Sequence, residues 1–232
     1  MPRTRGRAPA GGRADALSQE LIVSAAIALL DERGERGLTF RLLAEQLNTG
    51  TGALYWHVSN KGELVVLAAD QVLGHALAGD PQREENPRAA LHALAIAVFD
   101  ALDRHRWAAP HVNAPPMLVN ALRLLDRIGT LVARTGLPAE RHFVAATAVS
   151  FYITGVSAKI IAPRIPLDAP ASRDAYLAQT AERWERLDPA DYPFLAHAAK
   201  DLRDHDDRDQ FITGLDMLLD GLNTTADPRS ST

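Results

Sequence analysis

A short N-terminal stretch gathers hydroxyl, aromatic and basic side chains at the spacing of two short helices joined by a tight turn. In a helix-turn-helix, the first helix braces on the DNA backbone and the second enters the major groove, which is about 12 Å wide. Five residues would lock the two helices together: Leu43, Ala44, Leu47, Leu54 and Val58. The residues left outside, which we expect to face DNA, are Arg41, Thr51, Ala53, Tyr55 and His57.

Two helices must precede the turn of this motif. Apolar residues recur at helical spacing from Ser18, which suits an N-cap, to Gly34, which suits a left-handed stop. Thr39 can cap the second helix. Asn48 follows it and tolerates the left-handed conformation that a tight turn needs.

Two more helices are predicted after the turn. Thr51 can cap a short third helix that runs through His57. The sequence from Asn60 to Glu63 reads as a capping box, in which the Asn60 side chain accepts from the Glu63 amide and opens a fourth helix. A polar stretch from Gly79 to Pro87 ends that helix, and we place the domain boundary within it.

Composition narrows the class of protein. Of the 232 residues, 47% are hydrophobic and 23% charged, as in a globular protein with a sizeable core. The absence of cysteine excludes disulfides, thiolate zinc sites and cysteine nucleophiles. No continuous run of roughly 18 apolar residues and no signal peptide is present, so we expect a cytoplasmic protein.

Charge is divided unevenly along the chain. Residues 1–62 hold eight basic and six acidic side chains, net +2, so the remainder carries net −6. Local field, rather than total charge, attracts phosphate, and a mildly basic head on an acidic body suits a protein that meets DNA at one end. The asymmetry is modest and does not decide the function by itself.

The rest of the chain keeps a helical period without strand alternation, so we expect an all-α fold. The predicted domains are a disordered basic arm (1–14), a helix-turn-helix domain (15–65), a larger helical domain (66–223) and a disordered tail (224–232). Proline and glycine divide the larger domain. The helices expected in it cover 87–105, 116–135, 140–162, 172–187, 194–203 and 208–222.

The segments 37–44 (GLTFRLLA) and 54–61 (LYWHVSNK) together resemble the tetracycline-repressor (TetR) family of transcriptional regulators. The segment 211–222 more weakly resembles the last dimer helix of the tetracycline repressor. The resemblance implies a homodimeric repressor that binds a palindromic DNA operator, dimerises through helices 140–162 and 208–222 as a four-helix bundle, and is released by a small-molecule effector. It implies a regulator rather than an enzyme, with no cofactor.

The resemblance also places DNA contacts. Thr51, Gly52 and Ala53 lie where groove-facing residues begin in the family. Tyr55, His57 and Lys61 stand at positions that usually contact phosphate. The full set of expected DNA-binding residues is Thr39, Arg41, Thr51, Gly52, Ala53, Tyr55, Trp56, His57 and Lys61.

This chain departs from the family pattern at two positions. Asn48 stands where glycine is usual, a mild change because asparagine tolerates the left-handed turn. Gly52 stands where a residue with a side chain is usual, so base reading is expected to be sparse. Specificity would then depend on Thr51, Arg41 and DNA shape, with the arginines of the arm either in a minor groove or without a partner.

We expect polar or aromatic groups at helix breaks or on otherwise apolar helices to contact the effector. They are His105, Trp107, Asn113, Asn120, Tyr152 and Trp184. The eight histidines lack the spacing of a zinc motif, so no metal site is expected. Two other classes stay open: a helical enzyme using His105 or His142 with an acid, and an adaptor that binds protein. Only a DNA-binding protein predicts affinity for a duplex that falls with salt.

Overall fold

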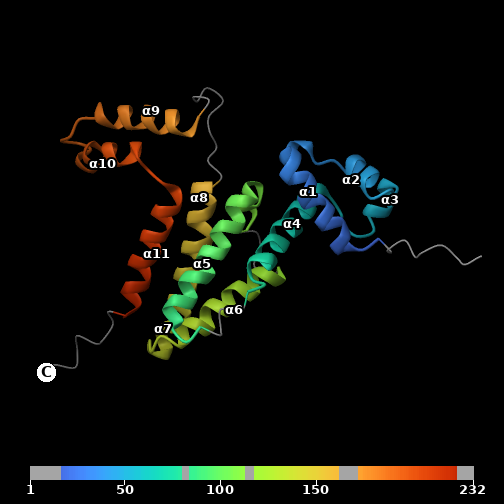
Figure 1. Cartoon of the computed structure of the whole chain (residues 1–232), viewed down its shortest axis with the longest axis horizontal. Helices are drawn as coiled ribbons and strands as arrows, with labels where there is room; N and C mark the ends of the chain where they lie inside the picture. The colour runs from blue at the N-terminus through green and yellow to red at the C-terminus, as the bar shows by residue number, and fades with distance from the viewer. Residues whose placement is uncertain (1–16, 80–83, 113–117, 162–171, 224–232) are drawn as a thin grey trace, which may run out of the picture. The chain divides into compact units, whose positions relative to one another are not determined.

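The structure is a computed structural model that describes residues 17–79, 84–112, 118–161 and 172–223 (Figure 1). Every regular element in these ranges is helical, which confirms the all-α prediction. The chain divides into two compact units, residues 1–68 and 69–232, and the division falls within helix α4 (Lys61–Ala76). The predicted arm (1–14), the predicted tail (224–232) and the effector candidate Asn113 lie outside the described residues.

The first unit contains α1 (Gln19–Gly37), α2 (Phe40–Gln46), α3 (Thr51–Leu54) and the start of α4. The predicted N-caps of the first two helices are confirmed. Ser18 accepts a 3.2 Å hydrogen bond from the Leu21 amide, and Thr39 accepts one of 3.2 Å from the Leu42 amide. Gly34 has the left-handed φ expected of a stop (64°), and the kink at this residue separates the long helix before it from the short helical segment that ends at Gly37.

The third helix is shorter than predicted, because α3 ends at Leu54 rather than His57. The Leu54 carbonyl accepts from the amides of both His57 and Val58, at 2.9 and 3.0 Å, so the chain tightens into a turn instead of continuing the helix. The predicted cap was also wrong, since Gly50 holds the N-cap position without a side-chain hydrogen bond and Thr51 is the first helical residue.

The start of α4 follows the predicted capping box. The Asn60 side chain accepts a 2.9 Å hydrogen bond from the Glu63 amide. The Glu63 carboxylate reaches back to the Ser59 amide at 2.7 Å, one residue before the position that the motif usually serves. Both orphan amides are therefore satisfied, and the direction in which α4 leaves the turn is fixed.

The second unit follows the predicted order of helices. Its elements after α4 are α5 (Pro87–Arg104), the 3₁₀ turn η2 (Arg106–His111), α6 (Val119–Ala133), α7 (Ala139–Phe151), the π-turn η3 (Tyr152–Val156), α8 (Ser157–Ile161), α9 (Arg173–Glu185), α10 (Pro193–Arg203) and α11 (Asp207–Asn223). The helix predicted over 140–162 is thus one run, α7 to α8, interrupted by a π-turn. The 3₁₀ turn lies between the helices predicted over 87–105 and 116–135.

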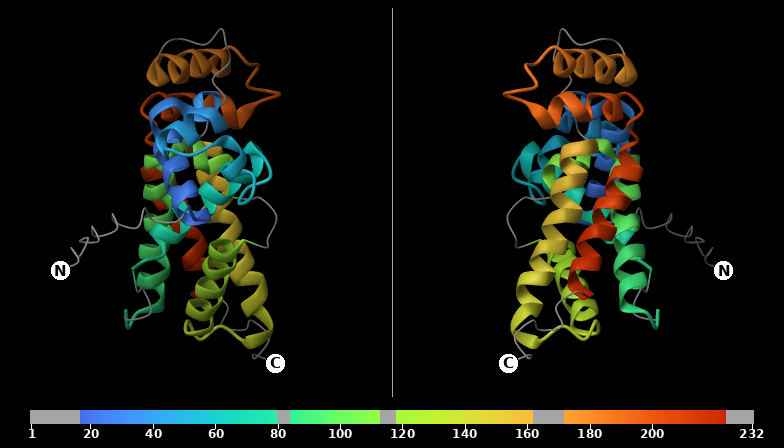
Figure 2. Two further views of the ribbon diagram at one scale, coloured as in Figure 1. Left: turned by 90° about the vertical axis from the view of Figure 1, so that its right-hand side faces the viewer. Right: turned by 90° about the vertical axis from the view of Figure 1, so that its left-hand side faces the viewer.

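In the second unit, helices that follow one another in the chain pack in pairs. Helix α6 packs along α7, and α9 packs along α10 as a hairpin. Helix α11 lies beside α5 and the α7–α8 run, as the two views of Figure 2 show. Among the described residues, one run, Ala139–Ile161, is long and apolar enough to span a membrane by length and composition alone, and 39% of its apolar window is buried within the fold. A single such run is weak evidence for a membrane span.

Aromatic rings join α11 to its neighbours. Phe211 is fully buried and stacks on Phe99 of α5, with ring centroids 4.5 Å apart. The Tyr152 hydroxyl donates a 2.9 Å hydrogen bond to the Phe211 carbonyl. Burial raises the pKa of the Tyr152 phenol, which favours the neutral form that donates this bond. Gly214, one turn further along α11, leaves the space that this phenol occupies.

Replacing Gly214 by alanine should therefore destabilise the protein, since a Cβ at this position would overlap the Tyr152 hydroxyl. We expect the Gly214→Ala change to lower the free energy of unfolding by about 1–3 kcal/mol, measured by urea denaturation. Gly221→Ala is the matched control on α11, because nothing lies within 4 Å of its Cβ position. It should be neutral or stabilise by up to about 1 kcal/mol. Equal effects of the two changes would contradict this account of Gly214.

Candidate nucleic-acid interface and apolar cavity

Helices α2 and α3 are held together by the residues predicted to lock them. Leu43 and Leu54 are fully buried, and Ala44 and Val58 are nearly so. Leu47 is only half-buried. Between the helices Asn48 adopts a left-handed conformation with φ of 50°, as predicted, and the Thr49 amide donates to the Ala44 carbonyl at 2.9 Å. The two helices and their turn therefore form the predicted helix-turn-helix.

Contacts from outside α3 fix its short body. The rings of Phe40 on α2 and Tyr55 lie with centroids 4.8 Å apart, tilted by 52°. The Gln19 side-chain amide, at the start of α1, donates a 3.2 Å hydrogen bond to the His57 carbonyl. Both contacts hold the turn that follows α3, so four residues of regular helix are enough to set its direction.

Lys61 joins the start of α4 to the end of α1. Its ammonium group donates to the Glu35 carbonyl, one of the backbone acceptors near the end of α1. An ammonium group has three hydrogens, so this bond leaves donors for another partner. The sequence predicted Lys61 as a phosphate contact and did not indicate this second, structural contact.

The predicted DNA-binding residues lie between Thr39, the N-cap of α2, and Lys61, the first residue of α4, around the buried α2–α3 contact. Trp56 is 89% exposed, and a large apolar ring left in water usually marks a binding surface. The Arg41 side chain is 80% exposed, and its ion pair with Glu45 spans 3.7 Å, which leaves its charge accessible. Also exposed are Thr39, Thr51, Gly52, Tyr55 and Lys61, whereas Ala53 and His57 are half-buried.

The described effector candidates are not brought into one site. His105 and Trp107 form an edge-to-face ring pair with centroids 6.4 Å apart. Tyr152 is engaged with Phe211, and Asn120 with Asp70 of α4. Trp184 lies half-buried on α9.

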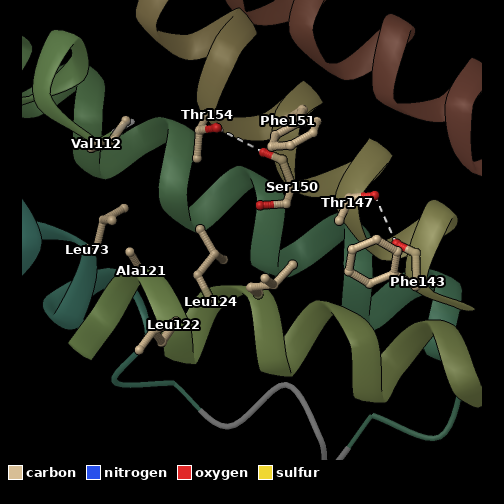
Figure 3. Close-up of a pocket in the computed structure, with 11 residues that line it drawn as sticks. Leu73, Val112, Ala121, Leu122, Leu124, Phe143, Thr147, Ser150, Phe151 and Thr154 are labelled. Atoms are coloured by element: carbon tan, nitrogen blue, oxygen red, sulfur yellow. Dashed lines mark hydrogen bonds between the residues drawn. The ribbon is translucent and has the colours of Figure 1, made fainter. Parts of the chain in front are cut away.

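A cavity of about 410 Å³ lies elsewhere in the second unit (Figure 3). It is mostly apolar, with three hydroxyl groups on the α7–η3 side. None of the described effector candidates lines it, because sequence reasoning favoured polar groups and the lining is chiefly of residues that resemble ordinary core. Its lining residues are Leu73, Val112, Ala121, Leu122, Leu124, Leu125, Phe143, Thr147, Ser150, Phe151 and Thr154.

A buried carboxylate ties α4 to α6, two of the helices that line this cavity. Asp70 is 8% exposed, and its carboxylate accepts from the backbone amides of Asn120 and Ala121 at 3.1–3.3 Å. The Asn120 side chain adds two 3.0 Å hydrogen bonds, to the Asp70 carboxylate and to its carbonyl. Leu118, the N-cap residue of α6, offers no side-chain cap, so Asp70 supplies one from another helix.

Close approach of α6 at this point requires Gly74. A Cβ on Gly74 would lie 2.8 Å from the Asn120 side-chain nitrogen. One turn further, Arg127 of α6 donates to the carbonyls of Leu77 and Gly79, at the end of α4. Each helix therefore caps an end of the other. The only trace of this in the sequence is a lone aspartate within the apolar stretch 64–73.

Among the described residues, no group of three or more histidine, aspartate or glutamate side chains is placed to hold a metal ion.

Comparison with known proteins matches both units. The sequence model described as "Bacterial regulatory proteins, tetR family" matches residues 22–68, and that of the "Tetracyclin repressor-like, C-terminal domain" matches residues 80–226. The HTH-type transcriptional repressor DrrR1 of Streptomyces coeruleorubidus is 30% identical over 94% of this chain and 81% of its own length. The class D tetracycline repressor of Escherichia coli is 30% identical over 88% of each chain.

Solved structures agree with the sequence comparison. A TetR transcriptional regulator from Streptomyces coelicolor has a TM-score of 0.72 and 38% identity, covering 89% of this chain and 98% of its own. The TetR family protein ActR from the same organism, solved in complex with actinorhodin, has a TM-score of 0.71 and 25% identity, covering 89% and 96%.

Replacing Asp70 by asparagine should weaken the tie between α4 and α6. An amide accepts through one oxygen only and loses the charge that strengthens hydrogen bonds to a helix N-terminus. We expect Asp70→Asn to lower the free energy of unfolding by about 1–3 kcal/mol in a thermal or urea melt. Asp126→Asn, at an exposed position of the same α6, should change it by less than about 0.5 kcal/mol. An Asp70→Asn variant as stable as the control would contradict the capping role.

Proposed function

The chain belongs to the TetR family of transcriptional regulators, and on that basis we propose that it is a cytoplasmic repressor whose homodimer binds a palindromic DNA operator and is released by a small-molecule effector. The observation that supports this best is the exposed surface of α2 and α3. Trp56 and Arg41 are held in solvent there by a tightly packed backing. A surface that keeps a tryptophan exposed on a rigid support suits a duplex.

Base reading falls to few residues in this proposal. Helix α3 has four residues, and Gly52 contributes no side chain. Nothing lies within 4 Å of a Cβ built on Gly52, so internal packing does not require glycine there. Its absence of a side chain lets the backbone approach base edges closely, while Thr51 and Arg41 supply hydrogen-bond donors. Tyr55, His57 and Lys61 would contact phosphate groups, which set register without reading sequence.

Dimerisation is proposed through the α7–α8 run and α11. These helices expose large apolar side chains: Phe143 (75%), Val144 (66%) and Phe151 (71%) on α7, and Met217 (70%) on α11. Apolar exposure on this scale usually marks an interface. A second copy is the occupant we propose, because twofold symmetry supplies the second head that a palindromic operator needs, in the next major groove about 34–36 Å away.

The effector would act through α4. A ligand shifts an equilibrium only if it binds one conformation better than the other. Helix α6 supplies four residues of the cavity wall and is bound to α4 at Asp70 and Arg127. Helix α4 also contributes its first turns to the unit that carries the DNA-binding surface. A ligand that displaces α6 would therefore displace α4. ActR, which has been solved with bound small molecules, supports a ligand-binding role for this fold.

The proposed function is tested by selecting duplexes that bind the purified protein from a random pool, then titrating the selected duplex against salt. We expect an approximate palindrome with half-sites one helical turn apart and an affinity that falls steeply with salt. Failure to enrich any sequence, together with a binding constant independent of salt, would refute it and favour an enzyme or a protein adaptor.

Removing the Arg41 charge should weaken duplex binding. Because a dimer presents Arg41 twice, Arg41→Ala should lower affinity by at least about tenfold and reduce the slope of log K against log salt by about two. The measurement is fluorescence anisotropy of a labelled duplex. Arg183→Ala removes an exposed arginine from α9 and should leave both quantities unchanged. Arg41 has no role in binding if the two variants behave alike.

A charge on the proposed dimer face should separate the subunits. Val144→Glu buries an unpaired carboxylate in the interface, so we expect the sedimentation mass to halve and duplex affinity to fall at least about tenfold. Val119→Glu places the same charge at an exposed position of α6 (57%) and should remain dimeric. A dimeric Val144→Glu variant would show that the interface lies on another face.

A further inference from the structure

The two threonine hydroxyl groups in the cavity lining already use their hydrogens in bonds to the backbone. The Thr147 hydroxyl donates to its own helix, to the carbonyls of Phe143 and Val144 at 2.9 and 3.0 Å. The Thr154 hydroxyl donates to the Ser150 carbonyl at 3.0 Å. A threonine hydroxyl has one hydrogen, so each of these groups offers the cavity only the lone pairs of its oxygen. Figure 3 shows the Thr147–Phe143 and Thr154–Ser150 bonds along the α7–η3 wall.

This wall therefore presents acceptors in a row. Thr147, Ser150 and Thr154 follow one another at spacings of three and four residues, which places them along one side of the helical run. The Ser150 hydroxyl can rotate to donate or to accept. While these intrahelical bonds are kept, a ligand atom that meets Thr147 or Thr154 must itself be a donor, because two acceptors facing each other leave both unsatisfied.

The opposite wall is apolar. Helix α6 contributes Ala121, Leu122, Leu124 and Leu125, and Leu73 of α4 adjoins them. The rings of Phe143 and Phe151 flank the hydroxyl row and offer faces on which a flat apolar molecule can lie. Burial against these residues would supply most of the binding free energy.

Charge is missing from this lining. None of the eleven described residues that form it has an ionisable side chain. A carboxylate or ammonium group entering the cavity would lose its hydration without gaining a charged partner, which is costly. The chemistry of the walls thus selects against ions of either sign.

We infer that the cavity binds an uncharged, largely apolar molecule that carries hydroxyl or N–H groups along one edge and turns that edge toward Thr147 and Thr154. The inference rests on the proposed effector function and specifies the chemical class of the effector. It also assigns Thr147 and Thr154 as specificity-determining residues that accept from the ligand.

The test uses two matched trios of probes. One is para-phenylphenol, its methyl ether and the para-phenylbenzoate anion; the other is estradiol, its phenolic methyl ether and its phenolic sulfate. Each trio keeps the ring system and changes the phenolic group from a donor into an acceptor or an anion; the estradiol members all keep the aliphatic hydroxyl. Dissociation constants for the full-length protein are measured by calorimetry at neutral pH, where phenols stay protonated. In at least one trio we expect the phenol to bind about three- to tenfold tighter than the ether, and at least about tenfold tighter than the anion.

Variants connect this preference to the two threonines. Thr147→Val and Thr154→Val keep the side-chain shape and should each weaken phenol binding about three- to tenfold while leaving the ether unchanged. Thr147→Ser retains the hydroxyl and should therefore keep the preference for the phenol over the ether. Thr180→Val is the control, because Thr180 of α9 makes the same intrahelical bond, to the Tyr176 carbonyl at 2.8 Å, and is absent from the cavity lining.

Each contrary result overturns a stated part of the inference. An anion that binds as well as the phenol refutes the selection against charge. A phenol that binds no better than its ether, or that ignores both valine variants, refutes the acceptor role of the threonines. If no member of either trio binds, the cavity does not take this class. Duplex binding measured on the same samples without probes separates these outcomes from failure of the proposed repressor function, which would abolish it.

Discussion

The Asp70 carboxylate is the group on which the second unit's response would depend. A carboxylate this deeply buried is tolerable only while its lone pairs are satisfied, and here the donors come from the first turn of α6. If α6 moves, Asp70 must move with it, because the carboxylate would otherwise stay buried without hydrogen-bond donors, at a large cost in free energy. The same α6 forms one wall of the cavity. A ligand that displaces α6 would therefore also displace α4, because leaving the Asp70 carboxylate without its donors costs free energy.

The α7–α8 run must serve several surfaces at once. Ala145, Ala146 and Val149 are buried in the core, whereas Phe143 and Phe151 reach the cavity and remain largely exposed. The π-turn between Tyr152 and Val156 changes the helical period midway, which alters the face that later residues present. A helix with such demands is apolar on nearly every side, and this explains why its composition satisfies the criteria for a membrane span.

The sequence predicted local features well where one residue decides the outcome. Ser18, Thr39 and Asn60 cap helices because their side chains reach an amide a few residues away, and Asn48 turns because its own side chain tolerates a positive φ. The end of α3 was missed because the Leu54 carbonyl takes two amides at once, a choice that depends on packing rather than on the types of residues 55–57.

The cavity was missed for a different reason. Its lining is leucine, alanine, phenylalanine and small hydroxyl residues, which form core in most helical proteins, and only their arrangement in space leaves a volume unfilled. Asn120 and Tyr152 are predicted effector contacts because they are polar groups on apolar helices. In the structure they bind Asp70 and the Phe211 carbonyl, which come from positions far away in the chain. Long-range pairing of this kind is invisible to periodicity.

The empty space around Gly52 bears on how a regulator of this kind can come to recognise a different DNA operator. The space around its α-carbon is empty, and its backbone is ordinary helix rather than a conformation that only glycine adopts. Many different residues can be installed there without repacking the head, and alanine or a longer side chain would even strengthen a helix that has only four residues. In the proposed repressor, a substitution at Gly52 alone would therefore alter operator preference, which makes this position the natural starting point for engineering a regulator that recognises a different DNA sequence.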